Sequence, residues 1–164
     1  MHADSPRRIA FYPCCGNDLV KPLRLLAGDV DYMFFCDRFD FGAKERPKSS
    51  GGSSPRLPTF EFLVGAWREK VKDIGPFDLL FYRRDSEGEG GSGDSALSKN
   101  ALSLLQDCMS ASSWIVTDGI YDPDRIIEKV RRHGVAGCGA RVLALQPDEQ
   151  LEKQGLMRIC FDKN

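Results

Sequence analysis

Short runs of apolar and aromatic residues, separated by amphipathic or polar segments, constrain the fold of this chain most. Each run is bounded by turn-forming residues and is rich in Phe, Tyr, Ile, Val and Leu. The runs are 8–12, 31–36, 77–82, 113–119 and 141–146. Runs of this kind are typical of strands that are buried on both faces, as in a parallel sheet covered by helices.

Four segments between the runs have the apolar periodicity of helices: 22–29, 59–75, 97–110 and 122–134. The first has Pro22 in its first turn and Gly28 at its end. The last begins with Asp122 as an N-cap and ends at Gly134. The second segment leaves two interpretations open, because its part 59–64 could be a strand that leads into a shorter helix.

The alternation of strands and helices predicts the fold class. We expect an α/β three-layer sandwich with a mostly parallel, doubly wound sheet and right-handed crossovers. The last two apolar runs, 141–146 and 155–162, are joined by a polar loop without room for a crossover helix, so we expect a C-terminal antiparallel hairpin. The length predicts one domain over 1–164, with flexible loops at about 43–56 and 85–95.

The composition argues against several classes of function. Lys and Arg total 23 and Asp and Glu total 24, so no overall charge attracts nucleic acid, and we do not expect it as a partner. No segment reaches the roughly 18 apolar residues of a membrane span. We therefore expect a cytoplasmic protein without a membrane partner. The six cysteines are irregularly spaced and lack the spacing of zinc ligands, which indicates reduced thiols and no metal site.

The first strand runs into a turn that is a candidate ligand site. In doubly wound sheets, ligands bind beyond the carboxyl ends of the strands, where this turn directs backbone N–H groups outward. Asp37 ends the next strand, 21 positions after Gly16, where an acidic residue commonly holds a ribose. The candidate cofactor-binding residues are Pro13, Cys14, Cys15, Gly16, Asn17, Asp18 and Asp37.

These features together resemble the class I S-adenosylmethionine (SAM)-dependent methyltransferases. The resemblance rests on the glycine turn, the acid that closes the second strand, a later strand opening with Asp78, and the terminal hairpin. The family's turn reads acidic-x-Gly-x-Gly-x-Gly, and only Gly16 matches it. Tyr12 stands in place of the acid, Cys14 in place of the first glycine and Asp18 in place of the last. The resemblance implies SAM or a related nucleoside as cofactor.

The departures from the family pattern affect the expected cofactor site and the expected number of strands. Side chains at Cys14 and Asp18 would narrow the approach of the backbone to the methionine part of the cofactor. Between Asp37 and Asp78 the chain has room for one helix, or for one strand and one helix, where the family has helix, strand and helix. We therefore expect that one edge strand is lost or replaced by the basic loop. The free edge would permit a homodimer by strand pairing.

Cys14 and Cys15 raise the alternative of a nucleophile, because a thiolate at a helix N-terminus has a lowered pKa. Cysteine phosphatases require Cys-x5-Arg. The positions six residues on are Val20 and Lys21, so the arginine is absent and we do not expect this chemistry.

Other polar residues have structural interpretations. His133 lies in the last turn of a predicted helix, where a cation is favoured, and His2 lies in a tail. Arg83 and Arg84 could bind an anionic substrate, although we favour a solvated pair that balances the acidic loop beside them. No residue can be assigned a catalytic role.

Two functions remain. The leading interpretation is a methyltransferase-like protein that binds SAM or a related nucleoside and acts on an unknown substrate, with catalysis through positioning. The alternative is a non-catalytic Rossmann-like module that has lost its cofactor and acts through a protein partner. Whether the chain is an enzyme stays open at this point, because fold does not determine reaction.

Overall fold

The structure is a computed structural model that describes residues 7–40, 56–83, 104–105, 107–118 and 140–163. In chain order its elements are β1 (Ile9–Pro13), α1 (Val20–Leu25), β2 (Tyr32–Asp37), β3 (Thr59–Val64), α2 (Trp67–Lys70), β4 (Phe77–Tyr82), β5 (Met109–Asp118), β6 (Ala140–Gln146), α5 (Glu149–Glu152) and β7 (Leu156–Lys163).

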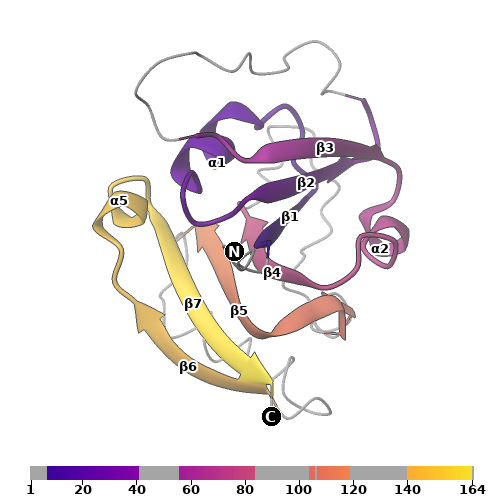
Figure 1. Cartoon of the computed structure of the whole chain (residues 1–164). Helices are drawn as coiled ribbons and strands as arrows, with labels where there is room; N and C mark the ends of the chain where they lie inside the picture. Colours follow the sequence, from indigo (N-terminus) through magenta and orange to yellow (C-terminus); the bar gives the residue numbers. More distant parts are fainter. Residues whose placement is uncertain (1–6, 41–55, 84–103, 106, 119–139, 164) are drawn as a thin grey trace, which may run out of the picture.

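The seven strands form one sheet in the order β3-β2-β1-β4-β5-β7-β6 (Figure 1). Strands β1 to β5 pair with their neighbours in parallel, and β7 lies antiparallel between β5 and β6. The chain moves outward from β1 through β2 to β3 and then returns to β4 on the other side of β1, so the strand order reverses beside β1. This arrangement confirms the predicted mostly parallel sheet and the C-terminal antiparallel pair.

The strands are buried on both faces, which explains their continuous apolar runs. Successive side chains of β1, and of β4 from Leu79 to Tyr82, alternate between two core clusters, as the two-residue period of a strand requires. The cluster on the side of α2, the α2-side core, includes Phe11, Leu80, Tyr82, Trp67 and Leu105. The cluster on the side of α1, the α1-side core, includes Tyr12, Phe81, Leu19, Leu23 and Leu151. The sheet therefore lies between two apolar layers, as predicted for the three-layer sandwich.

Helix α1 overlaps the predicted segment 22–29 but begins two residues earlier and ends at Leu25. Pro22 lies in its first turn, where the missing N–H of proline is not needed, and Leu23 is buried in the α1-side core. Gly28 follows the helix with a φ of 94°, a conformation that favours glycine. No helix among the described residues is long and apolar enough to cross a bilayer.

The segment 59–75 resolves into a strand and a short helix, which was one of the two interpretations left open. Residues Thr59–Val64 form β3, which pairs in parallel with β2 at the edge of the sheet. The expected loss of an edge strand is therefore wrong. A six-residue run rich in Phe, Leu and Val fits a half-buried edge strand, and Phe60 packs edge-on against Phe35 at 5.9 Å between ring centroids. Self-association through this edge stays a prediction.

The structure describes only part of the two remaining segments that were predicted to be helices. Residues 104–105 and 107–108 are helical, in agreement with the end of the segment 97–110, but β5 begins at Met109 rather than at residue 113. The predicted helix 122–134 and most of the two predicted loops lie outside the described residues. The single-domain assignment stays a prediction.

Arg158 of β7 connects the C-terminal hairpin to the parallel part of the sheet. Its guanidinium pairs with Asp29, which follows α1, and with Asp148 at 3.2 Å. It also lies over the ring of Trp114 in β5, 5.6 Å from the centroid. The Arg158 side chain is only 11% exposed. Asp148 additionally caps α5, since its carboxylate accepts the N–H groups of Gln150 and Leu151.

We predict that Arg158→Ala lowers the free energy of unfolding by about 2–3 kcal/mol, because it leaves two partly buried carboxylates without their cation. Lys153→Ala is the matched control, since Lys153 pairs with Glu149 at 2.9 Å but both side chains are mostly exposed. That control should change stability by less than about 0.5 kcal/mol. Urea unfolding of both variants tests the difference, and equal losses would contradict this role of Arg158.

Candidate functional site

The carboxyl ends of β1, β2 and β4 meet where the strand order reverses. Pro13 at the end of β1 lies opposite Cys36 in β2, and Phe11 lies opposite Leu80 in β4. In open α/β sheets this point forms a crevice in which ligands bind. The turn 13–18 follows β1 at this position, so it lies at the edge where open α/β sheets bind ligands.

Backbone hydrogen bonds hold the turn 13–18 against β2 while leaving part of it accessible. Pro13 and Cys15 are buried, and the Cys15 N–H donates to the Cys36 carbonyl oxygen at 3.2 Å. Asn17 is exposed, and Cys14, Gly16 and Asp18 are of intermediate exposure. The turn is therefore anchored on one side and open on the other.

Two residues of the turn adopt left-handed backbone conformations. The φ of Cys14 is 54° and that of Gly16 is 55°. Cys14 is a non-glycine residue with this φ, which costs of the order of 1 kcal/mol. Its side chain packs against the α2-side core. A Cβ added to Gly16 would have no heavy atom within 4 Å, so a side chain there would project into open space.

Asp37 binds the turn through its side chain. Its Oδ2 accepts the Gly16 N–H at 2.9 Å, and its Oδ1 accepts the Phe39 N–H at 3.3 Å. Each carboxylate oxygen has a second lone pair, so both can accept a further hydrogen bond from a ligand hydroxyl. The structure thus brings Asp37 and Gly16 together and gives Asp37 a role in the turn itself. The binding of a ribose by Asp37 stays a prediction.

Sequence reasoning missed Phe39. Among the described residues, Phe39 and Val64 are the exposed large hydrophobic side chains, at 66% and 48%, and both flank Asp37. Val64 lies directly opposite Asp37 in β3. An exposed aromatic ring beside a carboxylate offers a surface on which a base can stack. The available signal was an aromatic residue two positions after the acid that ends the second strand.

Asp18 forms an ion pair that connects the turn after β1 to the end of β4. The Arg83 guanidinium, directly after β4, donates to Asp18 Oδ2 at 2.8 Å. The hydroxyl of Tyr12 donates to the same oxygen at 3.3 Å. No described residue donates a hydrogen bond to Asp18 Oδ1. The sequence favoured the interpretation of Arg83 as a solvated residue that balances the acidic loop beside it. The ion pair with Asp18 corrects that interpretation. Arg84 and the acidic loop lie outside the described residues.

Burial and nearby charges determine the protonation states of Tyr12 and Arg83, the two residues that bind Asp18. Burial lowers the pKa of the Arg83 guanidinium, but its hydrogen bond with Asp18 and the carboxylate charge outweigh this, so the pKa is raised overall. Burial, and then the nearby Asp18 charge, raise the pKa of the Tyr12 hydroxyl. Tyr12 therefore stays a neutral donor beside Asp18, and the Arg83 guanidinium stays charged.

The thiols of Cys15 in the turn and Cys36 in β2 are unsuited to nucleophilic chemistry. Burial, and then the Asp37 charge, raise the pKa of the Cys15 thiol. Burial raises the pKa of the Cys36 thiol from 9.0 to about 12. Both groups are protonated at neutral pH, which agrees with the expectation that Cys15 is no phosphatase nucleophile. The five described cysteines are all reduced.

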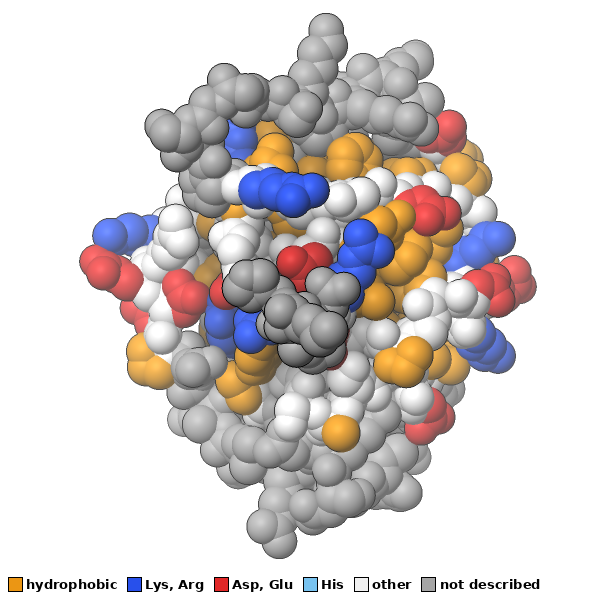
Figure 2. All heavy atoms as spheres, in the orientation of Figure 1, with side chains coloured by type: hydrophobic (Ala, Val, Ile, Leu, Met, Phe, Trp, Pro, Cys, Tyr) orange, Lys and Arg blue, Asp and Glu red, His pale blue; other side chains and the backbone are white. Residues whose placement is uncertain are grey.

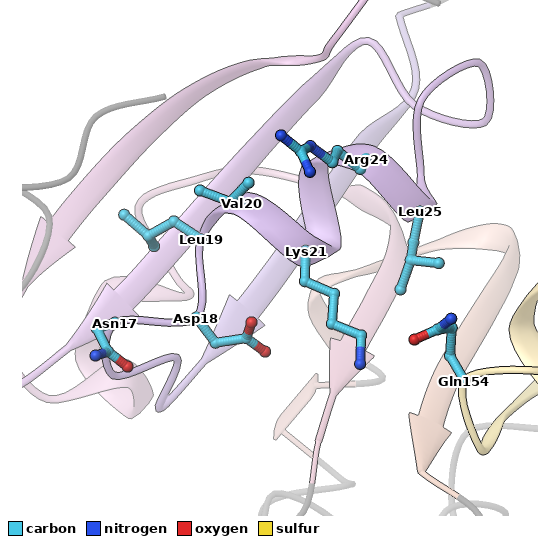
Figure 3. Close-up of a pocket in the computed structure, with 8 residues that line it drawn as sticks. All are labelled: Asn17, Asp18, Leu19, Val20, Lys21, Arg24, Leu25 and Gln154. Carbon is cyan, nitrogen blue, oxygen red and sulfur yellow. The ribbon is translucent and has the colours of Figure 1, made fainter. Parts of the chain in front are cut away.

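A pocket of about 370 Å³ opens beside the turn, between α1 and the start of β7 (Figure 3). It is lined by Asn17, Asp18, Leu19, Val20, Lys21, Arg24, Leu25 and Gln154. Asn17 and Asp18 belong to the turn 13–18, so the pocket adjoins this turn.

The sequence analysis also singled out Asp78, His2 and His133. Asp78 Oδ2 accepts the N–H of Ile9 at 2.8 Å, which joins the starts of β4 and β1 and makes Asp78 structural. His2 and His133 lie outside the described residues. In the part of the chain that the structure describes, no three His, Cys, Asp or Glu side chains are grouped to hold a metal ion. On the face of the molecule that Figure 2 shows, basic and acidic side chains are interspersed among the described residues.

We predict that stability falls at alkaline pH. The native state keeps the Cys36 proton up to a pKa of about 12, whereas the unfolded thiol loses it near 9.0. Between these values the free energy of unfolding should fall by about 1.4 kcal/mol per pH unit for this thiol. Cys36→Ala should be less stable at pH 7 but should lose stability less steeply above pH 9. Urea unfolding from pH 7 to 11 measures both slopes, and equal slopes would contradict the role of Cys36.

No family model and no curated protein matches this sequence. Solved structures do match it. A Streptococcus mutans protein that is provisionally classed as a SAM-dependent methyltransferase superposes on 98% of this chain, with a TM-score of 0.60 and 9% identity. The chain spans about half of that protein, 46% of its length.

Two further methyltransferase structures are similar over 96% of this chain with 12% identity and TM-scores of 0.54. One is the antibiotic-resistance methyltransferase Kmr, of which this chain covers 87%. The other, also from Streptococcus mutans and provisionally classed as a methyltransferase, was solved in complex with S-adenosylhomocysteine (SAH), and this chain covers 89% of it. At these identities the likeness concerns architecture: the chain has the Rossmann-like fold of the class I SAM-dependent methyltransferases.

Proposed function

We propose that this protein is a SAM-dependent methyltransferase that binds its cofactor at the turn 13–18 and Asp37. The observation that most supports the proposal is the open backbone at Gly16, which lies at the reversal point of the sheet and is bonded to Asp37. The S. mutans structure solved with SAH has the same fold, which makes SAH the natural first ligand to test.

The nucleoside part of the cofactor fits the residues around Asp37. The second lone pairs of the Asp37 carboxylate would accept the two ribose hydroxyls. The exposed Phe39 ring and Val64 would cover the base, since both flank Asp37. Gly16 would allow the ligand to approach the backbone, because a side chain at this position would occupy the open space.

The amino-acid part of the cofactor fits the ion pair of Asp18 and Arg83. A methionine group has an ammonium and a carboxylate, and the ion pair offers one group of each opposite sign. Both observed bonds to Asp18 end on Oδ2, so Oδ1 can accept from the ammonium. Arg83 has further N–H donors for the carboxylate. In this proposal Asp18, positioned by the Tyr12 hydroxyl, replaces the acid that the family has at position 12.

When bound, SAM supplies an electrophilic methyl group on a sulfonium. The protein's task is then to hold the nucleoside at Asp37, to hold the amino-acid part at Asp18 and Arg83, and to present the acceptor in line with the methyl group. This positioning accounts for most of the catalysis that such a site needs, since a bound pair reacts without the entropy cost of encounter. We propose a small molecule as acceptor.

We predict that SAH raises the thermal stability of the protein. At 100 times its dissociation constant it should stabilise the fold by about 2.7 kcal/mol, which corresponds to roughly 5–10 °C for a domain of this size. Gly16→Val should abolish the shift, because its side chain would fill the space that the ligand needs. Differential scanning fluorimetry measures both.

Gly28→Val is the matched control, since Gly28 also has a positive φ and open space around its Cβ position. It lies beyond α1, away from the crevice, so it should lower the melting temperature of the free protein yet retain the shift with SAH. If neither SAM nor SAH shifts the unmodified protein, the proposal fails, and the non-catalytic module with a protein partner becomes the better account.

We predict that Asp18→Asn and Arg83→Gln each weaken SAH binding by about tenfold or more, because each removes one charge-assisted contact with the amino-acid part. Binding of 5′-methylthioadenosine, which lacks that part, should change little. Isothermal titration calorimetry with both ligands separates the two halves of the site. Glu149→Gln, which removes an exposed charge on α5, is the control. Equal weakening of both ligands, or of neither, would contradict this assignment.

A further inference from the structure

The pocket between α1 and the start of β7 lies on the ligand-binding edge of the sheet. Leu156, the first residue of β7, pairs with Asp118 at the carboxyl end of β5, which brings the connection from α5 to β7 to this edge. Gln154 reaches the pocket from that connection, and Asn17 and Asp18 reach it from the turn. Its volume of about 370 Å³ is in the range of small-molecule sites.

The pocket has an excess of positive charge. Lys21 and Arg24, three positions apart on α1, both line it. Lys21 extends toward the space between Asp18 and Gln154 (Figure 3). The one carboxylate in the lining, Asp18, already binds Arg83 and Tyr12. Neither Lys21 nor Arg24 forms an ion pair with any described residue. Lys21 is the cation that extends into the space, whereas the Arg24 side chain points to the other side of α1 (Figure 3).

The rest of the lining suits a small organic anion. The amide groups of Asn17 and Gln154 can donate hydrogen bonds, and Leu25 supplies apolar surface next to Gln154. Leu25 and Gln154 point toward the same space as Lys21 (Figure 3). Two like charges three residues apart on a helix repel each other, and an anion bound at Lys21 would weaken that repulsion.

We infer that this pocket binds a small molecule with a carboxylate or phosphate group and, on the basis of the proposed function, that this molecule is the methyl acceptor. Lys21 binds its anionic group, with Arg24 as a second cation in the lining, while the Asn17 amide holds it beside the cofactor. In the transfer, the nucleophilic atom of the acceptor bonds to the methyl carbon and the carbon–sulfur bond breaks with its electron pair staying on sulfur. SAH results, and the proton of the acceptor passes to water.

The first experiment needs no cofactor. Inorganic phosphate is titrated at constant ionic strength, with chloride as the balancing anion, and amide signals are followed by ¹H–¹⁵N NMR. We expect saturable shifts at Lys21, Leu25 and Gln154. Lys21→Gln and Arg24→Gln should each weaken this binding by about fivefold or more. Lys72→Gln removes the same charge from an exposed site just after α2, so it should leave the affinity unchanged.

Shifts that do not saturate, or an affinity that falls equally in Lys72→Gln, would overturn the anion site. The phosphate titration does not depend on SAH binding. Absence of anion binding at the pocket is therefore distinguishable from failure of the proposed function.

The second experiment follows SAH formation from SAM with small carboxylic acids, phosphate monoesters and their neutral amides or esters. Turnover confined to the anionic members and reduced by Lys21→Gln supports the acceptor assignment, and turnover of neutral members at equal rates overturns it.

Discussion

The hydrogen bond between the Gly16 N–H and the Asp37 carboxylate, 2.9 Å long, connects the turn after β1 to the end of β2. With the bond from Cys15 to the Cys36 carbonyl, it fixes the turn at the point where the strand order reverses. The other site features depend on this geometry. It leaves Gly16 open to solvent, it places Asp37 beside Phe39, and the turn that it anchors carries Asp18 toward Arg83.

The departures from a glycine-rich turn are compensated by specific contacts. Cys14 takes the left-handed conformation that a glycine would adopt freely, and packing against the α2-side core holds its side chain. Asp18 is turned toward Arg83 and the Tyr12 hydroxyl. The two side chains that replace glycines are thus held by a partly buried contact at Cys14 and by an ion pair at Asp18. Whether they narrow the approach of a cofactor stays a prediction.

Local sequence determined the elements but could not supply the distant contacts. The apolar runs in β1, β2 and β4 were predictable because burial on both faces demands continuous hydrophobicity. Residues 59–64 stayed ambiguous because a short apolar run fits either a strand or a helix, and only pairing with β2 decides. Arg83 and Asp18 are 65 positions apart, and neither residue indicates the other in sequence. Phe39 became notable only through its exposure beside Asp37.

The most direct test of this account is a crystal structure of the protein grown with SAH. The account predicts the ligand in the crevice, with its ribose hydroxyls on the Asp37 carboxylate, its base against Phe39 and its amino-acid group between Asp18 and Arg83. A ligand bound elsewhere on the molecule, or a turn 13–18 that closes over Gly16 and excludes it, would contradict the account.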